Sequence, residues 1–177
     1  FHFMDISRVL LSPKGRIGPR DFLRGLILLT GAGLIIQVLT VVASIGAAIL
    51  QYPMLWAYFC VFGKRLHDAG QTAWFNILIL FGFVVVTSIL NAVLLPILSP
   101  NMMPLMTQIQ EIGLKDGFGG MLQAQQEHAL QIARGTALTT LASFLIGSAG
   151  LALIGARLPS DPETNAHGPP TGSSDTP

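Results

Sequence analysis

The sequence predicts an all-α integral membrane protein, a four-helix bundle with both termini in the cytosol. The first observation is composition, since 51% of the 177 residues are apolar and only 11% are charged. The mean hydropathy of +0.60 is far above that of ordinary soluble domains. The second observation is a set of four long apolar segments, and the third is an uneven distribution of Lys and Arg around them.

Each of the four apolar segments approaches the roughly 20 helical residues that the hydrocarbon core of a bilayer requires. The second segment carries no charge but contains Pro53, which predicts a shorter or kinked span entered through a very tight turn. No cleavable signal peptide is predicted, because the first apolar run is too long and lacks a small-residue cleavage site. Whether residues 1–3, which precede Met4, are native stays open. The predicted spans are residues 22–44, 45–62, 74–98 and 136–156.

The predicted orientation follows from Lys and Arg, which resist translocation when they lie in short loops. Only Lys115 and Arg134 lie on one side of the predicted membrane. The other side therefore faces the cytosol, with the N-terminal segment 1–21, the connection after the second span and the tail 158–177. Its eight basic residues are Arg8, Lys14, Arg16, Arg20, Arg24, Lys64, Arg65 and Arg157.

Residues 99–135, which connect the third and fourth spans, are predicted to lie on the extracytoplasmic side. Leu105, Ile109 and Ile112 share one helical face, and glycines at 117, 119 and 120 interrupt the pattern. Two short amphipathic helices on the membrane surface fit this pattern, and so does a solvated loop with some helix. The tail 158–177 is rich in Pro, Gly, Ser, Thr and Asp and is predicted to be disordered.

The stretch GKRLHDAG, residues 63–70, places four ionisable side chains between the second and third spans. Lys64 and Arg65 are predicted to anchor the helix end at the inner leaflet. Gly70 predicts a left-handed C-terminal cap, Thr72 predicts the N-terminal cap of the next helix, and Trp74 predicts an indole at the interface.

A catalytic interpretation of this stretch is not favoured. Asp68 can pair with Lys64 or Arg65 at helical spacing, but adjacent helical residues point about 100° apart, so Asp68 does not orient His67 as a general base. The sequence has no phosphate-binding or nucleophile motif and no basic stripe interleaved with aromatic residues. We therefore predict no enzyme, no cofactor and no nucleic-acid binding. The remaining histidines, His2, His128 and His167, are too scattered to predict a metal site.

Within the spans, Gln37 and Asn91 are strongly polar side chains, and no charged residue lies at mid-membrane depth. This disfavours ion-coupled transport, while a homo-oligomeric pore lined by Gln37 or Asn91 stays an alternative. Small residues are predicted to let the helices approach closely. They are Gly31, Gly33, Ser143, Gly147 and Gly150.

Three motifs occur in order along the chain: SPKGRIGPRDF at 12–22, KRLHDAGQTAWF at 64–75 and PSDPETNAHGPP at 159–170. With the apolar segments, they resemble the domain-of-unknown-function 805 family of small bacterial inner-membrane proteins. The resemblance implies a bacterial inner-membrane location and a multi-helix bundle, and no established reaction. Leu23, Phe75 and His167 depart from the family pattern. The segment 99–135 is much longer than the family's usual connection between the last two helices, so the resemblance implies that it is an extracytoplasmic insertion. The matching residues are Gly15, Arg16, Ile17, Arg20, Arg65, Leu66, His67, Asp68, Gly70, Trp74, Asn165 and Gly168.

We expect the first two motifs to meet at the cytosolic face. Arg20 is the predicted partner of Asp68, because its planar fork can hold a carboxylate at two points. Lys64 and Arg65 would then bind lipid phosphates, and His67 would line the same pocket. The alternative is a set of separately solvated anchors. The candidate site residues are Gly15, Arg16, Arg20, Lys64, Arg65, His67, Asp68, Gly70 and Trp74.

These observations predict a non-enzymatic membrane protein of the bacterial plasma membrane. Its cytosolic face is expected to bind a protein partner or anionic lipid headgroups. The alternative function is that of a small transporter or channel component acting as a homo-oligomer. The ligand, the partner and the oligomeric state are not defined by the sequence.

Overall fold

The computed structural model describes residues 6–42 and 45–171, and within these ranges the chain forms helices and no β-strand. Three helices are long and apolar enough to cross a membrane: α2 (Pro19–Val42), α4 (Phe75–Leu98) and α7 (Ala137–Arg157). At about 1.5 Å per residue, helices of this length reach across a hydrocarbon core roughly 30 Å thick. They correspond to three of the four expected spans.

The second expected span consists of two elements. Ile45–Leu50 forms the 3-10 helix η1, and the helix α3 (Gln51–Asp68) follows directly. Pro53 lies in the first turn of α3, where a backbone N–H has no helical acceptor to lose. Helix α3 continues to Asp68, six residues past the expected end of the span at residue 62, so the charged motif belongs to the helix itself.

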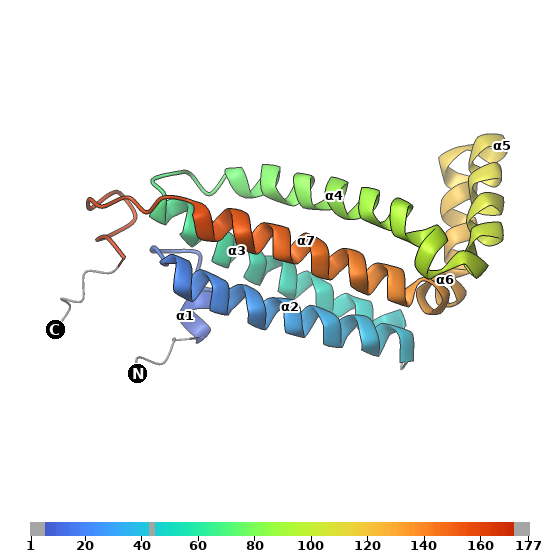
Figure 1. Cartoon of the computed structure of the whole chain (residues 1–177), viewed down its shortest axis with the longest axis horizontal. Helices are drawn as coiled ribbons and strands as arrows, with labels where there is room; N and C mark the ends of the chain where they lie inside the picture. Colours follow the sequence, from blue (N-terminus) through green and yellow to red (C-terminus); the bar gives the residue numbers. More distant parts are fainter. Residues whose placement is uncertain (1–5, 43–44, 172–177) are drawn as a thin grey trace.

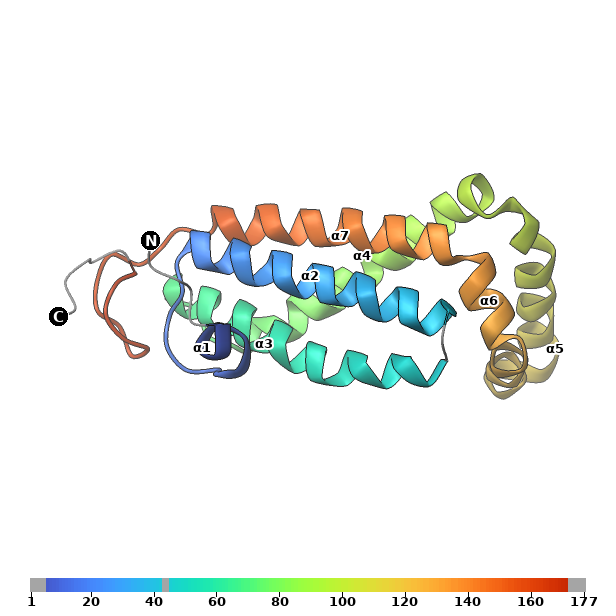
Figure 2. The same ribbon diagram turned by 90° about the horizontal axis from the view of Figure 1, so that it is seen from below.

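Helices α2, α3, α4 and α7 run side by side (Figures 1 and 2). Helix α2 packs against α3 and α7, and α4 packs along α7. A methyl group on Gly155 would lie only 2.3 Å from the ring of Phe22, so a glycine is required where α7 crosses α2. The buried hydrophobic cluster lies near the first turns of α2 and contains Val9, Ile17, Phe22, Leu26, Leu29, Ala57, Val61 and Phe62.

Three of the five small residues expected at helix contacts lie at such contacts. A methyl group on Gly33 would approach a ring of α7 to 2.9 Å, and one on Gly147 would approach a side chain of α4 to 2.8 Å. Ser143 is fully buried. Gly31 and Gly150 face open space, so the prediction is wrong for these two.

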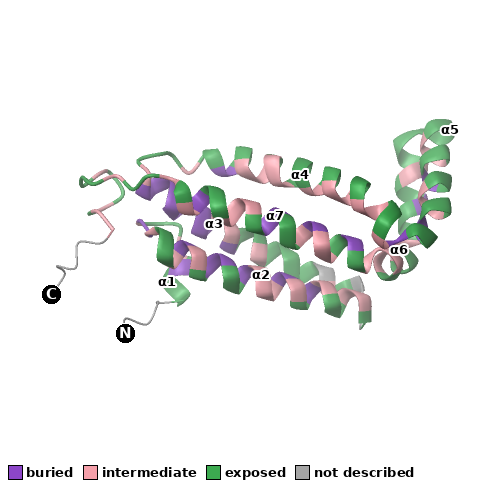
Figure 3. Ribbon diagram, in the orientation of Figure 1, coloured by how far each residue is buried: buried purple, intermediate pink, exposed green. Residues whose placement is uncertain are grey.

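Many residues on the outer surfaces of the long helices are exposed (Figure 3), and they include many large hydrophobic side chains. Helix α4 is the clearest case, because Asn76 is its single buried residue. A helix that is apolar on all sides and is not covered by its own chain is typical of a membrane span, whose outer face contacts lipid. The exposed side chains of α4 include Ile77, Leu78, Phe81, Val85, Val93 and Ile97.

Residues 99–135 form a helical unit at one end of the bundle, with η2 (Pro100–Met102), α5 (Met103–Glu127) and α6 (Ala129–Gly135). Helix α5 stands across the bundle end and is interrupted at Gly117, whose φ of 75° and ψ of −170° are not helical. The break therefore lies at the first of the three predicted glycines, and the segment is helical rather than a loop. Its buried residues in α5 are Ile109 and Ala124.

The opposite end of the bundle brings together the short helix α1 (Ile6–Leu11), the loop before α2, the end of α3 and residues 158–171 (Figure 1). The first and last described parts of the chain thus lie at the same end. The expectation of a disordered tail is wrong for residues 158–171, which fold back over the bundle end through hydrogen bonds to buried side chains. Residues 172–177 lie outside the described residues.

Candidate functional site

The candidate site is organised by the last turn of α3, which ends in a Schellman motif. Gly70 has a φ of 69°, as the sequence predicts for a left-handed cap, and its N–H donates to the carbonyl of His67 over 3.1 Å. The N–H of Gln71 donates to the carbonyl of Leu66 over 2.8 Å. This cap fixes the direction of the chain after Asp68, so the side chains of the last turn stay within the bundle.

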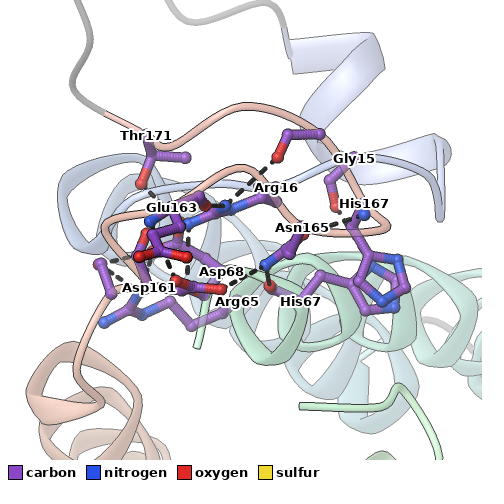
Figure 4. A network of polar contacts seen from close by, with 12 residues as sticks. Gly15, Arg16, Arg65, His67, Asp68, Asp161, Glu163, Asn165, His167 and Thr171 are labelled. Atoms are coloured by element: carbon purple, nitrogen blue, oxygen red, sulfur yellow. Dashed lines mark hydrogen bonds and ion pairs between the residues drawn. The ribbon is translucent and has the colours of Figure 1, made fainter. Parts of the chain in front are cut away.

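Asp68 is fully buried and lies at the centre of a polar network (Figure 4). Its Oδ1 accepts hydrogen bonds from Arg16 Nε over 3.1 Å and from the Thr171 hydroxyl over 2.6 Å. Its Oδ2 accepts from Arg65 Nη1 and from the Ser160 hydroxyl, the latter over 2.6 Å. One carboxylate therefore joins the first motif, the second motif and the tail, and charge-assisted hydrogen bonds of this kind are the stronger class.

Arg16 connects Asp68 to the tail. Besides the carboxylate, its guanidinium donates to the carbonyls of Asp161 over 2.5 Å, Glu163 over 2.8 Å and Gly168 over 3.3 Å. Its Nη2 also donates to the backbone carbonyl of Asp68 over 3.3 Å. The planar fork of an arginine can serve several acceptors at fixed angles, which a lysine ammonium cannot reproduce.

The Arg65 side chain is equally enclosed, with 1% of the residue exposed. Its Nε donates to the carbonyl of Gly155 over 2.8 Å, and its Nη2 donates to the carbonyl of Leu158. Lys64 is also 1% exposed, and its Nζ donates to the carbonyl of Val9 over 2.7 Å. The prediction that these two side chains extend to lipid phosphates is wrong, because α3 continues past its expected end and turns them into the protein.

The predicted pair between Arg20 and Asp68 is also wrong. Arg20 is exposed on the first turn of α2, whereas both carboxylate oxygens of Asp68 are occupied by other donors. Arg16 forms the ion pair with Asp68 instead, because it lies in the loop before α2 and its side chain can reach across the bundle end. The alternative of separately solvated anchors is wrong for Arg16, Arg65 and Asp68, which are buried.

His67 faces away from Asp68 and packs under the tail. Its Nδ1 lies 3.1 Å from the carbonyl of Gly15, so this nitrogen carries the proton, and its ring stacks on His167 with centroids 3.6 Å apart. Burial lowers the pKa of His67 below its usual value; the Gly15 hydrogen bond opposes this and the neighbouring His167 adds to it. Asn165 Nδ2 donates to the His67 carbonyl over 3.1 Å and to the Asp161 carboxylate over 3.0 Å.

Asp161 is held in its charged form at the edge of the network. The hydrogen bond from Asn165 is the main cause that lowers the pKa of Asp161, and the backbone N–H of Glu163 and the charge of Arg16 act in the same direction. Partial burial opposes these effects. The tail therefore contributes a carboxylate to the outer side of a cluster that contains two buried arginines.

Trp74 lies outside this network. It precedes the first residue of α4, is 78% exposed and points to the surroundings, as an interfacial indole would. The predicted side-chain cap by Thr72 is wrong, because α4 begins after Trp74 without a side-chain cap; the Thr72 carbonyl accepts from the N–H of Phe75 over 3.3 Å.

Sequence reasoning missed the contribution of the tail. Ser160, Asp161 and Thr171 were assigned to a disordered segment, and polar composition alone offers no signal that distinguishes them. The one available signal was the spacing of Asn165 and Gly168 in the third motif, which form an isolated antiparallel bridge in the structure. Within residues 6–42 and 45–171, no group of three or more His, Cys, Asp or Glu side chains could hold a metal ion.

No protein-family model, no curated protein and no solved structure matches this chain. The resemblance to the domain-of-unknown-function 805 family, which rests on the three motifs, therefore stays a prediction.

Proposed function

We propose that the chain is a non-enzymatic, four-span protein of the bacterial inner membrane whose cytosolic face contacts anionic lipid headgroups. Three spans are α2, α4 and α7, and the fourth is η1 with α3, which runs beside α2. The apolar outer faces of these helices support insertion, and the resemblance of the three motifs to the domain-of-unknown-function 805 family is the reason for proposing the bacterial inner membrane. Both termini are cytosolic in this proposal.

The observation that carries the proposal is the difference in charge between the ends of the bundle. Among the described residues, the end with α1 and the tail has eight Lys and Arg residues and four acidic residues, whereas the end with α5 and α6 has Lys115 and Arg134 alongside three acidic residues. Juxtamembrane basic residues are attracted to anionic headgroups by about 1 kcal/mol each. The exposed members at the basic end are Arg8, Lys14, Arg20, Arg24 and Arg157.

The buried cluster serves this function indirectly. Arg16, Arg65 and Asp68 satisfy one another and the tail carbonyls, so the cluster stabilises the bundle end and leaves headgroup contact to the exposed arginines around it. A protein partner, the other expected ligand of this face, would meet the outer side of the tail. Trp74 is suited to the interface at the same end.

The test is lipid retention by the full chain in nanodiscs that contain phosphatidylglycerol and phosphatidylcholine. The double substitution Arg20→Gln and Arg24→Gln should reduce the phosphatidylglycerol retained after mild detergent extraction, and raised salt should reduce it in the wild type. Lys115→Gln with Arg134→Gln is the matched control at the opposite end. Equal phosphatidylglycerol retention by both double variants would contradict the proposal.

A transporter or channel component is the second candidate, and one observation favours it. Gln37 borders two cavities between the helices. Asn91, in contrast, donates to the Thr87 carbonyl of its own helix over 2.8 Å. Solute flux into liposomes that is abolished by Gln37→Leu and preserved by Asn91→Leu would favour this function over headgroup binding.

A further inference from the structure

Two cavities meet at a pair of glutamines in the half of the bundle that lies away from Asp68. The larger, of about 280 Å³, lies between α2, α3, α4 and α7. The smaller, of about 220 Å³, lies between the end of α2, the start of α3, α6 and the start of α7. Gln37 and Gln51 line both cavities, so a single ligand could extend from one into the other through this polar point.

The wall of the larger cavity is mainly apolar, with Met54, Phe83, Phe144 and Leu151 from three helices. Its polar members are Gln37, Gln51, Tyr58 and Asn76. The Gln37 Oε1 and the Tyr58 hydroxyl are buried and have no hydrogen-bond partner among the residues that the structure describes. A buried amide oxygen without a donor is unfavourable, and buried polar groups are nearly always satisfied. The cavity therefore offers a hydrocarbon compartment beside an acceptor that lacks a donor.

The charge of the lining restricts the ligand further. Among the residues that the structure describes, no Lys, Arg, His, Asp or Glu lines either cavity. A charged headgroup would be transferred into this region without a counter-ion, which is strongly unfavourable. A neutral headgroup with a hydroxyl donor, attached to a hydrocarbon chain, satisfies the Gln37 oxygen and fills the apolar compartment.

We propose that the two cavities form a binding site for a neutral, single-chain, hydroxyl-bearing lipid of the monoacylglycerol class. The chain occupies the larger cavity, a hydroxyl donates to Gln37 Oε1, and the rest of the headgroup extends past Gln51 into the smaller cavity. The site goes beyond the proposed function, because it lies at the far end of α2 from the basic residues and takes an uncharged ligand.

The test uses the full chain in nanodiscs with a monoacylglycerol that carries a photoreactive diazirine at the end of its chain. We expect labelling of peptides from α3, α4 or α7 that line the larger cavity. Excess monooleoylglycerol should displace the probe, whereas methyl oleate, which has no donor, and phosphatidylglycerol, which is charged, should not. Gln37→Leu should reduce labelling about tenfold, because it removes one hydrogen bond to the ligand. Asn91→Leu should leave labelling unchanged.

A second variant, Met54→Trp, fills the larger cavity from α3 and should reduce labelling by a similar factor. It replaces Gln37→Leu if Gln37→Leu does not fold. Three results would each overturn the proposal: displacement by methyl oleate as effective as that by monooleoylglycerol, displacement by phosphatidylglycerol, or undiminished labelling of the folded cavity variant. Equal phosphatidylglycerol retention by the two double variants, which would contradict the proposed function, would leave the expected labelling unchanged, so the two proposals fail separately.

Discussion

The two ends of the bundle are stabilised by different kinds of interaction. At the end that contains Asp68, buried hydrogen bonds join residues far apart in the chain, such as Arg16 to Asp68 and Arg65 to the Gly155 carbonyl. At the end that contains α5, several side-chain hydrogen bonds are local and exposed, such as Gln123 to Glu127 over 3.0 Å, and the long-range ones are fewer, namely Ser99 with Thr139 and Arg134 to the Val41 carbonyl. The first end therefore relies on a dense set of long-range polar contacts centred on Asp68, whereas the second has only a few, so substitutions of charged residues at the two ends should differ in cost.

The largest effect is expected from Asp68→Ala. Arg16 and Arg65 would stay buried without a carboxylate, and breaking a buried pair by removing one partner typically costs about 3–5 kcal/mol. Asp21→Ala removes a carboxylate from an exposed pair with Arg24 and should cost about 0–1 kcal/mol. Thermal unfolding in detergent measures both variants, and similar losses would remove the distinction between buried and exposed pairs.

The next effect concerns which arginine is coupled to Asp68. A double-mutant cycle of Arg16→Ala with Asp68→Ala should give an interaction free energy of about 0.5–3 kcal/mol, because the side chains touch. The parallel cycle of Arg20→Ala with Asp68→Ala should be additive within about 0.5 kcal/mol. Coupling to Arg20 and none to Arg16 would contradict the geometry of the site.

A smaller, pH-dependent effect is expected at His67. Because burial lowers its folded pKa, the unfolded chain binds more protons below about pH 6.5, and stability falls as the pH drops from there through the folded pKa. The melting temperature should therefore fall on mild acidification, and His67→Gln should flatten the profile. His128→Gln, at the other end of the bundle, is the control and should leave the dependence of the melting temperature on pH unchanged. If His67→Gln also leaves it unchanged, the titration belongs to another group.

The smallest effect is expected from deletion of residues 106–131 with a short polar linker. Met102 lies against Gly135, so the ends of the deleted unit are already close, and the buried contact of 2.9 Å between the Ser99 and Thr139 hydroxyls still joins α4 to α7. The shortened chain should remain inserted and extractable as a folded protein. Loss of the protein from the membrane would show that α5 contributes to the core of the bundle.

Several structural features could be predicted from the sequence because their causes are local. Apolar runs of sufficient length predict helices, and the glycines at 70 and 117 mark positions with positive φ, where other residues are strained. These predictions match α2, α4 and α7, the end of α3 and the break in α5. Neighbouring residues do not determine which side chains pair with Asp68, because those partners come from distant parts of the chain. The sequence therefore predicts Arg20 where the structure has Arg16.

The sequence by itself determined the helical class, the apolar surfaces and the accumulation of basic residues at one end, because hydropathy and helical length act over neighbouring residues. The tertiary structure alone decided that Lys64, Arg65 and Asp68 are buried and that residues 158–171 cover them. A buried guanidinium needs acceptors in several directions, and those acceptors are backbone carbonyls that every residue carries. Residue type therefore does not reveal which carbonyls serve Arg16, and only the path of the folded chain brings them within reach.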